Sequence, residues 1–98
     1  TRVRALLLKA MSSGELDQDG IALALNQSAS TLQRRLRREG TTYQRVLDTT
    51  RRELALEYLR EGQHTLADIT FLLGFADQSN FTRAFRRWTG KTPRQFLD

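Results

Sequence analysis

The sequence contains no cysteine, one proline and one histidine among its 98 residues. Without cysteine there is no disulfide, no thiolate nucleophile and no zinc site built on cysteine ligands. The single histidine, His64, has no partner at metal-ligand spacing, so the sequence predicts no metal, no cofactor, no catalytic residue and no enzyme. No apolar run approaches the roughly 20 residues of a membrane-spanning helix, and the first residues do not form a signal peptide.

Lysine is also scarce, and the positive charge is carried by arginine. Fourteen arginines accompany two lysines, with a net charge of +5 and a pI of about 10.7. The arginine fork binds phosphates and guanine edges more effectively than the lysine ammonium does. Because a basic pI also suits membrane surfaces and acidic proteins, the placement of the arginines has to decide between these partners.

Apolar residues recur at helical spacing and no stretch alternates with period two, so the predicted fold class is all-α. Caps and stops divide the chain into seven expected helices. Their expected ranges are 2–12, 17–25, Ser28 to just before Gly40, 42–61, Thr65 to Gly74, Asp77 to Thr89, and a short last helix from Pro93. Asp17 is the expected cap of the second helix, and Thr65 and Asp68 form an expected capping box.

One pattern occurs twice in the chain, at an offset of 48 to 50 residues. Each copy has a short apolar helix, a tight turn and an arginine-rich helix. In the turn, Asn26 occupies the place of Gly74, and both residue types tolerate a left-handed backbone. The predicted organisation is one domain, 1–98, in which a linker helix at 42–61 joins a first helix-turn-helix subdomain at 1–41 to a second at 62–98.

Each arginine-rich helix has an apolar stripe and a polar stripe. The apolar stripes are Ala29, Leu32 and Leu36 in the first copy and Phe81, Ala84, Phe85 and Trp88 in the second. The polar stripes are Ser30, Gln33, Arg34 and Arg37, then Ser79, Thr82, Arg83 and Arg86 at an offset of 49, with Gln78 one step earlier. The aromatic residues could stack on nucleobases, but their helical spacing favours a place in the core.

The polar stripes suit the major groove of DNA, because glutamine pairs bidentately with adenine and arginine with guanine. Basic residues further along are better placed for phosphates. The predicted phosphate contacts are Arg37, Arg38, Arg86, Arg87 and Lys91. For one stripe alone, a plain solvated helix face is an equal alternative. Two matching stripes, each behind a helix and a turn, favour DNA.

Three short motifs stand between Asp68 and Pro93. They are Leu73-Gly74-Phe75, Phe81-x-x-x-Phe85 and Gly90-x-x-Pro93, and together they resemble the C-terminal motif of the AraC/XylS family of bacterial transcription regulators. The stretch Leu32–Leu36 and the pair Arg51 and Ala55 also match, so the resemblance covers essentially the whole chain.

The resemblance implies seven helices in two helix-turn-helix subdomains, whose third and sixth helices enter successive major grooves. The base-reading residues that it implies are Ser30, Gln33, Arg34, Gln78, Ser79, Asn80, Thr82 and Arg83. Thr70 departs from the family's usual alanine, so its hydroxyl is expected to bond a backbone carbonyl. Arg51 is expected to cap or salt-bridge rather than to touch phosphate. Leu54 and Leu56 lie on different faces of the long helix and are not both expected to be buried.

The expected function is sequence-specific binding of double-stranded DNA, which regulates bacterial transcription, with activation expected. The expected partners are an asymmetric operator, RNA polymerase and an N-terminal effector or dimerisation domain preceding Thr1, in a cytoplasmic, nucleoid-associated protein. One rival is a module that docks on acidic proteins. The other is a domain of this type beside a DNA-repair methyltransferase, whose reactive cysteine would have to lie outside this chain.

Overall fold

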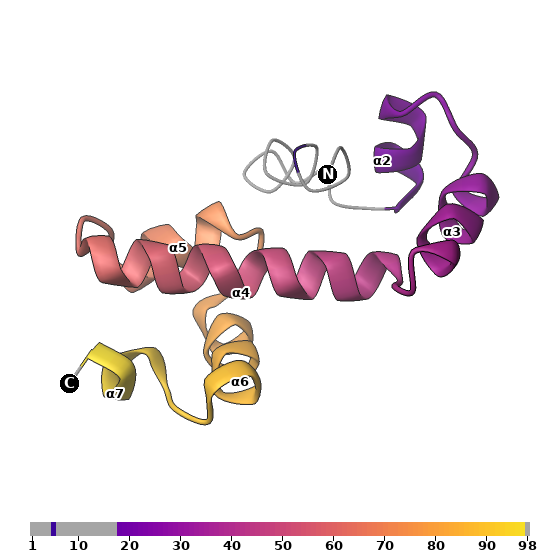
Figure 1. Cartoon of the computed structure of the whole chain (residues 1–98). Helices are drawn as coiled ribbons and strands as arrows, with labels where there is room; N and C mark the ends of the chain where they lie inside the picture. The colour runs from indigo at the N-terminus through magenta and orange to yellow at the C-terminus, as the bar shows by residue number, and fades with distance from the viewer. Residues whose placement is uncertain (1–4, 6–17, 98) are drawn as a thin grey trace. The chain divides into compact units, whose positions relative to one another are not determined.

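The computed structural model describes residue 5 and residues 18–97. Across those residues the regular structure is helical and includes no strand, which confirms the all-α class. The helices are α2 (Gln18–Ala24), α3 (Ala29–Arg38), α4 (Tyr43–Glu61), α5 (Leu66–Leu72), α6 (Gln78–Thr89) and α7 (Pro93–Leu97) (Figure 1). These six match expected helices. Apart from residue 5, the helix expected at 2–12 lies outside the described residues, as does the expected cap Asp17.

The chain divides into two compact units, Thr1–Thr50 and Arg51–Asp98. The division falls within α4, so each unit takes one part of that helix. Each unit contains a short helix, a turn and an arginine-rich helix: α2 with α3 in the first, and α5 with α6 in the second. The functional division at 1–41, 42–61 and 62–98 stays a prediction.

The helices begin where side-chain caps satisfy backbone N–H groups that have no partner within the helix. The hydroxyl of Ser28 accepts from the backbone N–H of Thr31 at 3.1 Å at the start of α3. Thr65 and Asp68 form the predicted capping box of α5, with bonds of 3.0 and 3.1 Å. The Asp77 carboxylate caps α6. These local signals confirm the expected helix starts.

The turns of the two copies have the same backbone conformation. Asn26 has a φ of 58° and Gly74 a φ of 79°, so both lie in the left-handed region, as predicted. The next residue in each copy donates its N–H to the carbonyl oxygen five residues earlier, Gln27 to Ala22 at 2.9 Å and Phe75 to Thr70 at 3.1 Å. This pairing closes each helix in a Schellman-type motif and directs the chain into the arginine-rich helix that follows.

The apolar stripes supply much of the cores of the two units, although Ala29 and Trp88 are only half-buried. In the first unit the buried hydrophobic residues are Ile21, Ala22, Leu25, Leu32, Leu36, Tyr43 and Leu47. In the second, Phe81 and Phe85 are fully buried, and Phe85 makes an edge-on contact with Phe96 at a centroid distance of 5.6 Å. Phe81 and Phe85 are therefore core residues and present no face on which a nucleobase could stack.

Two polar residues of the second unit bond backbone carbonyls. Thr70 donates from its hydroxyl to the carbonyl oxygen of Leu66 at 2.8 Å, which confirms the expectation for this departure from alanine. Arg51 donates from Nε to the carbonyl oxygen of Leu73 and from Nη2 to that of Gly74, and its guanidinium lies 4.3 Å from the Phe75 ring centroid. Arg51 therefore has a structural role, as predicted, and the structure shows that it caps the end of α5, a partner that the sequence did not indicate.

Candidate nucleic-acid interface

The predicted reading residues of the first unit lie on the exposed side of α3. Leu32 and Leu36 occupy the buried side, which leaves Ser30, Gln33 and Arg34 exposed. A surface hollow on this helix is lined by Thr31, Arg34, Arg37 and Arg38. Three guanidinium groups around one hollow create a positive potential that favours an anionic partner such as the DNA backbone.

The predicted reading residues of the second unit gather in the same way on α6. One hollow is lined by Gln78, Ser79, Thr82 and Arg83, all of which belong to the predicted set. Gln78, Ser79 and Arg83 are exposed and Thr82 is half-buried. The hollow holds both amide and guanidinium groups, which are the groups that read adenine and guanine edges.

Asn80, the remaining reading candidate, is half-buried and bonded within its own helix. Its backbone N–H donates to the Asp77 carboxylate at 2.8 Å, and its side-chain oxygen accepts from Nη2 of Arg83. The first unit has an equivalent contact that the sequence analysis missed: Nη2 of Arg34 donates to the hydroxyl of Thr31 at 3.4 Å. The signal for it was available, because Thr31 precedes Arg34 by three residues, a helical neighbour spacing.

The predicted phosphate contacts Arg37, Arg38, Arg86, Arg87 and Lys91 are all exposed. Arg37 and Arg38 share the hollow of α3 with Arg34, whereas Arg86 and Arg87 lie in the last turn of α6. Cations at a helix C-terminus also interact favourably with the helix dipole, which accounts for part of their placement without DNA. Arg35 differs from its neighbours, because its Nε lies 3.6 Å from the Glu39 carboxylate.

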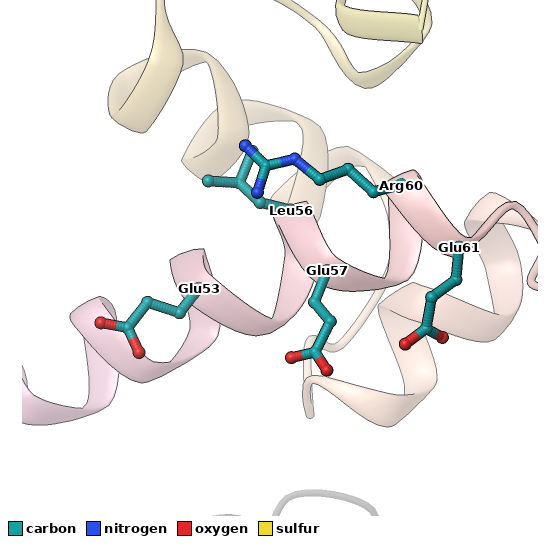
Figure 2. A pocket seen from close by; sticks show the side chains of 5 residues that line it. All are labelled: Glu53, Leu56, Glu57, Arg60 and Glu61. Atoms are coloured by element: carbon teal, nitrogen blue, oxygen red, sulfur yellow. The ribbon is translucent and has the colours of Figure 1, made fainter.

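The C-terminal part of α4 presents the opposite charge. A hollow there is lined by Glu53, Leu56, Glu57, Arg60 and Glu61. Figure 2 shows the three glutamates directed to one side of the helix, with Leu56 and Arg60 on the other. Carboxylates repel phosphates, so this side of α4 is unsuited to DNA. Leu54 and Leu56 are both half-buried, which agrees with the expectation that they are not both in the core.

The described residues offer little for other chemistry. His64 is exposed and makes an edge-on contact with the ring of Tyr58, at a centroid distance of 5.1 Å. Across residues 18–97, no group of three histidines, cysteines or carboxylates is arranged to hold a metal ion. In the same part of the chain, no helix is both long and apolar enough to cross a membrane.

A recognition helix that follows a tight turn and exposes glutamine and arginine at its N-terminal half is the element that helix-turn-helix proteins place in the major groove. Both units have such a helix, and its buried side is packed against the helix before the turn. The fold and the site therefore define a helix-turn-helix DNA-binding domain.

Comparison with known proteins identifies the family. A family profile described as "Helix-turn-helix domain" matches residues 21–98. Over all of its 98 residues the chain is 51% identical to the ornithine utilization regulator of Pseudomonas aeruginosa, of which it covers 29%. Over 78 residues, 80% of the chain, it is 36% identical to the urease operon transcriptional activator of Escherichia coli, of which it covers 26%. The chain belongs to the AraC/XylS family of transcriptional regulators.

A solved structure supports the same conclusion about the fold. The chain resembles a DNA-binding transcriptional dual regulator from Escherichia coli K-12 with a TM-score of 0.88 and 28% sequence identity, over 99% of this chain and 86% of that chain. The chain spans less than a third of the length of the two curated relatives named above.

Proposed function

We propose that the chain binds double-stranded DNA sequence-specifically, with α3 and α6 in successive major grooves of an asymmetric operator. It would do so as the C-terminal part of a longer, effector-responsive regulator of bacterial transcription. The observation that carries the proposal is the correspondence of two exposed faces at an offset of 49 residues, each of which has a reading arginine six residues after its helix cap.

The chemistry of each face indicates the bases that it reads. Arg34 and Arg83 suit guanine, and Gln33 and Gln78 suit adenine, because these side chains can form two hydrogen bonds with the major-groove edges of those bases. Ser30, Ser79 and Thr82 add shorter polar contacts. The two faces share their serine and their arginines, but Thr82 stands where the first face has Gln33, and Gln78 stands where α3 has Ala29. Because of these differences they should read different half-sites, and the operator should be asymmetric.

The exposed basic residues beyond the reading faces would hold the DNA backbone. Arg37, Arg38, Arg86, Arg87 and Lys91 are proposed to bind phosphates and to set the register of each helix on the duplex. Successive major grooves on one face of straight DNA lie about 34 Å apart. If α3 and α6 cannot both enter major grooves of straight DNA, the duplex must bend. Bending costs roughly a few kcal/mol, and the contacts made by the second helix offset that cost.

Activation and contact with RNA polymerase are a second part of the proposal. One relative is named as an activator of transcription. A bound activator needs a surface that does not face DNA, and the hollow lined by Glu53, Leu56, Glu57, Arg60 and Glu61 is proposed as that surface because its carboxylates repel phosphates. The other proposed partner is an N-terminal effector or dimerisation domain in the full-length protein, which would act in the cytoplasm at the nucleoid.

Selection of binding sites from a random pool of double-stranded DNA tests the main proposal. The selected duplexes should share two half-sites about 10 base pairs apart. Binding to them should withstand excess competitor DNA in a gel shift. If the pool yields no consensus and all sequences bind equally, the chain binds DNA only through its charge, and the proposal of sequence-specific recognition fails.

Transcription in vitro from a promoter that carries the selected site tests the second part. The chain, or the full-length regulator, should raise transcript levels, and Leu56→Ala or Glu57→Ala should lower that effect without weakening DNA binding. Equal transcript levels with and without the full-length protein would contradict activation.

A further inference from the structure

The N-terminal turn of α3 contains a chain of contacts that ends at a reading arginine. The cap residue Ser28 accepts the backbone N–H of Thr31 at 3.1 Å, and its hydroxyl donates to the Thr31 hydroxyl at 2.9 Å. The Thr31 hydroxyl in turn accepts from Nη2 of Arg34 at 3.4 Å. The arginine that is proposed to read guanine is therefore tethered to the residue three positions before it.

The N-terminal turn of α6 repeats this arrangement at the same spacing. The cap residue Asp77 accepts the backbone N–H of Asn80 at 2.8 Å, and the Asn80 side-chain oxygen accepts from Nη2 of Arg83. Cap, third residue and sixth residue thus correspond position for position with those of α3. A hydroxyl in one helix and an amide in the other provide the same kind of acceptor.

Such a tether lowers the conformational entropy that the arginine side chain loses when it binds a base. A free arginine side chain has many rotamers, and much of that freedom is lost when the side chain is fixed on a base. The guanidinium has five N–H donors, and the tether occupies one nitrogen, so donors remain for the O6 and N7 atoms of guanine. A side chain that is already held along the reading face loses less freedom on binding.

We infer that Thr31 and Asn80 are positioning residues that hold Arg34 and Arg83 in the orientation for reading guanine, an inference that rests on the proposed function. This assignment also changes the role of Asn80. Bidentate pairing with adenine needs both the amide nitrogen and the carbonyl oxygen of asparagine, and that oxygen already accepts from Arg83. The oxygen has two acceptor positions and Arg83 occupies one of them, so Asn80 is assigned to holding Arg83 rather than to pairing with a base.

Relaxation of the arginine Nε–H groups, measured by nuclear magnetic resonance on the free chain, tests the tether without DNA. The Nε–H groups of Arg34 and Arg83 should be more ordered than that of exposed Arg52. Thr31→Val should lower the order of Arg34 alone and Asn80→Leu that of Arg83 alone, whereas Thr31→Ser and Asn80→Asp should preserve it. If Arg34 and Arg83 are as mobile as Arg52 in the wild-type chain, the inference is wrong.

Binding to a selected duplex tests whether the tether serves recognition. Thr31→Val should weaken binding roughly two- to tenfold, the expected cost of fixing one free arginine. In the Arg34→Ala background, Thr31→Val should have no further effect on binding. In the wild-type background, Thr31→Ser should keep the wild-type affinity, because serine retains the hydroxyl. Thr49→Val, the same exchange at an exposed position of α4, is the matched control. An equal loss in both backgrounds would show that Thr31 acts independently of Arg34 and would overturn the inference.

The two arms separate this inference from the proposed function. If the wild-type chain shows no sequence preference, the proposed function fails, and the relaxation measurement still decides whether the arginines are held. If the chain prefers one sequence but Thr31→Val and Asn80→Leu leave its preference for guanine unchanged, the function stands and the positioning role is overturned.

Discussion

Arg51 donates a hydrogen bond from Nε to the backbone carbonyl oxygen of Leu73 at 2.8 Å, across 22 positions of the chain. The same guanidinium bonds Gly74 at 3.1 Å and lies over the Phe75 ring. The carbonyls at the end of α5 have no partner within the helix, so this side chain from α4 satisfies them. The turn that precedes α6 is thereby attached to α4.

Arg51→Ala should lower the free energy of unfolding of the second unit by about 1.5–3 kcal/mol, the usual range for a hydrogen bond to a charged group. Arg51→Lys should recover little, because an ammonium cannot reproduce the planar fork. Urea unfolding followed by Trp88 fluorescence measures the effect. Exposed Arg52→Ala is the matched control and should be nearly neutral. A neutral Arg51→Ala would mean that the cap contributes nothing to stability.

Phe85→Ala should cost about 3–5 kcal/mol, because it removes a fully buried ring that contacts both Phe81 and Phe96. Thermal unfolding monitored by circular dichroism measures the loss. Phe71 is 64% exposed, so Phe71→Ala should stay within about 0.5 kcal/mol of the wild type. A Phe85→Ala chain that keeps its melting temperature but loses DNA binding would show that Phe85 is not a core residue.

Arg34→Ala and Arg83→Ala should each weaken binding to the selected duplex by about 1–3 kcal/mol and relax specificity at one base pair. Fluorescence anisotropy on a set of duplexes, each changed at one position, measures both effects. In each variant, the base pair whose replacement no longer changes the affinity should contain a guanine in the selected duplex. This base pair should differ between the two variants. Equal losses on every duplex would assign these arginines to the phosphate backbone.

Arg37→Ala and Arg86→Ala should weaken binding to all sequences alike. Each should also reduce the slope of log K against log salt concentration by about one unit, because one fewer counterion is released. Titrations at several salt concentrations measure the slope. An unchanged slope would be evidence against a phosphate contact at that residue.

The capping box of α5 should make stability depend on pH. Hydrogen bonds from the backbone and side chain of Thr65 lower the pKa of Asp68 below its ordinary value. A carboxylate with a lowered pKa in the folded state stabilises fully above its ordinary pKa and loses that contribution as the pH falls through the folded value. Asp68→Asn should therefore show a smaller drop in melting temperature between neutral and acidic pH. An identical drop would indicate that ionised Asp68 contributes nothing.

Several features of the candidate site could be read directly from the sequence. Caps, turns and helix faces depend on contacts between residues at most five positions apart, and Ser28, Thr65 and Asp77 begin their helices as predicted. The left-handed turn residues Asn26 and Gly74 follow from the same local stereochemistry. The gathering of Gln78, Ser79, Thr82 and Arg83 at one hollow also follows, since their spacing places them on one helix face.

Other features depend on which of several possible rotamers a side chain adopts. The base-reading role that the sequence analysis gave to Asn80 stays a prediction, and the contact of its side-chain oxygen with Arg83 was not foreseen. The sequence analysis did not identify Thr31, which makes the equivalent contact with Arg34. Spacing alone indicates which residues can meet on a helix, but it does not indicate which rotamers they adopt.

The sequence by itself determined the helices, their ends and the two matching polar faces, because these arise from interactions within a single turn of the chain. Only the tertiary structure decided the partner of Arg51, since the carbonyls of Leu73 and Gly74 come within reach after α4 and α5 have packed. The burial of Phe81 and Phe85 beside Phe96 is likewise a product of packing. Which distant residues come into contact depends on the whole fold, because that fold has to bury apolar surface and satisfy buried polar groups at the same time.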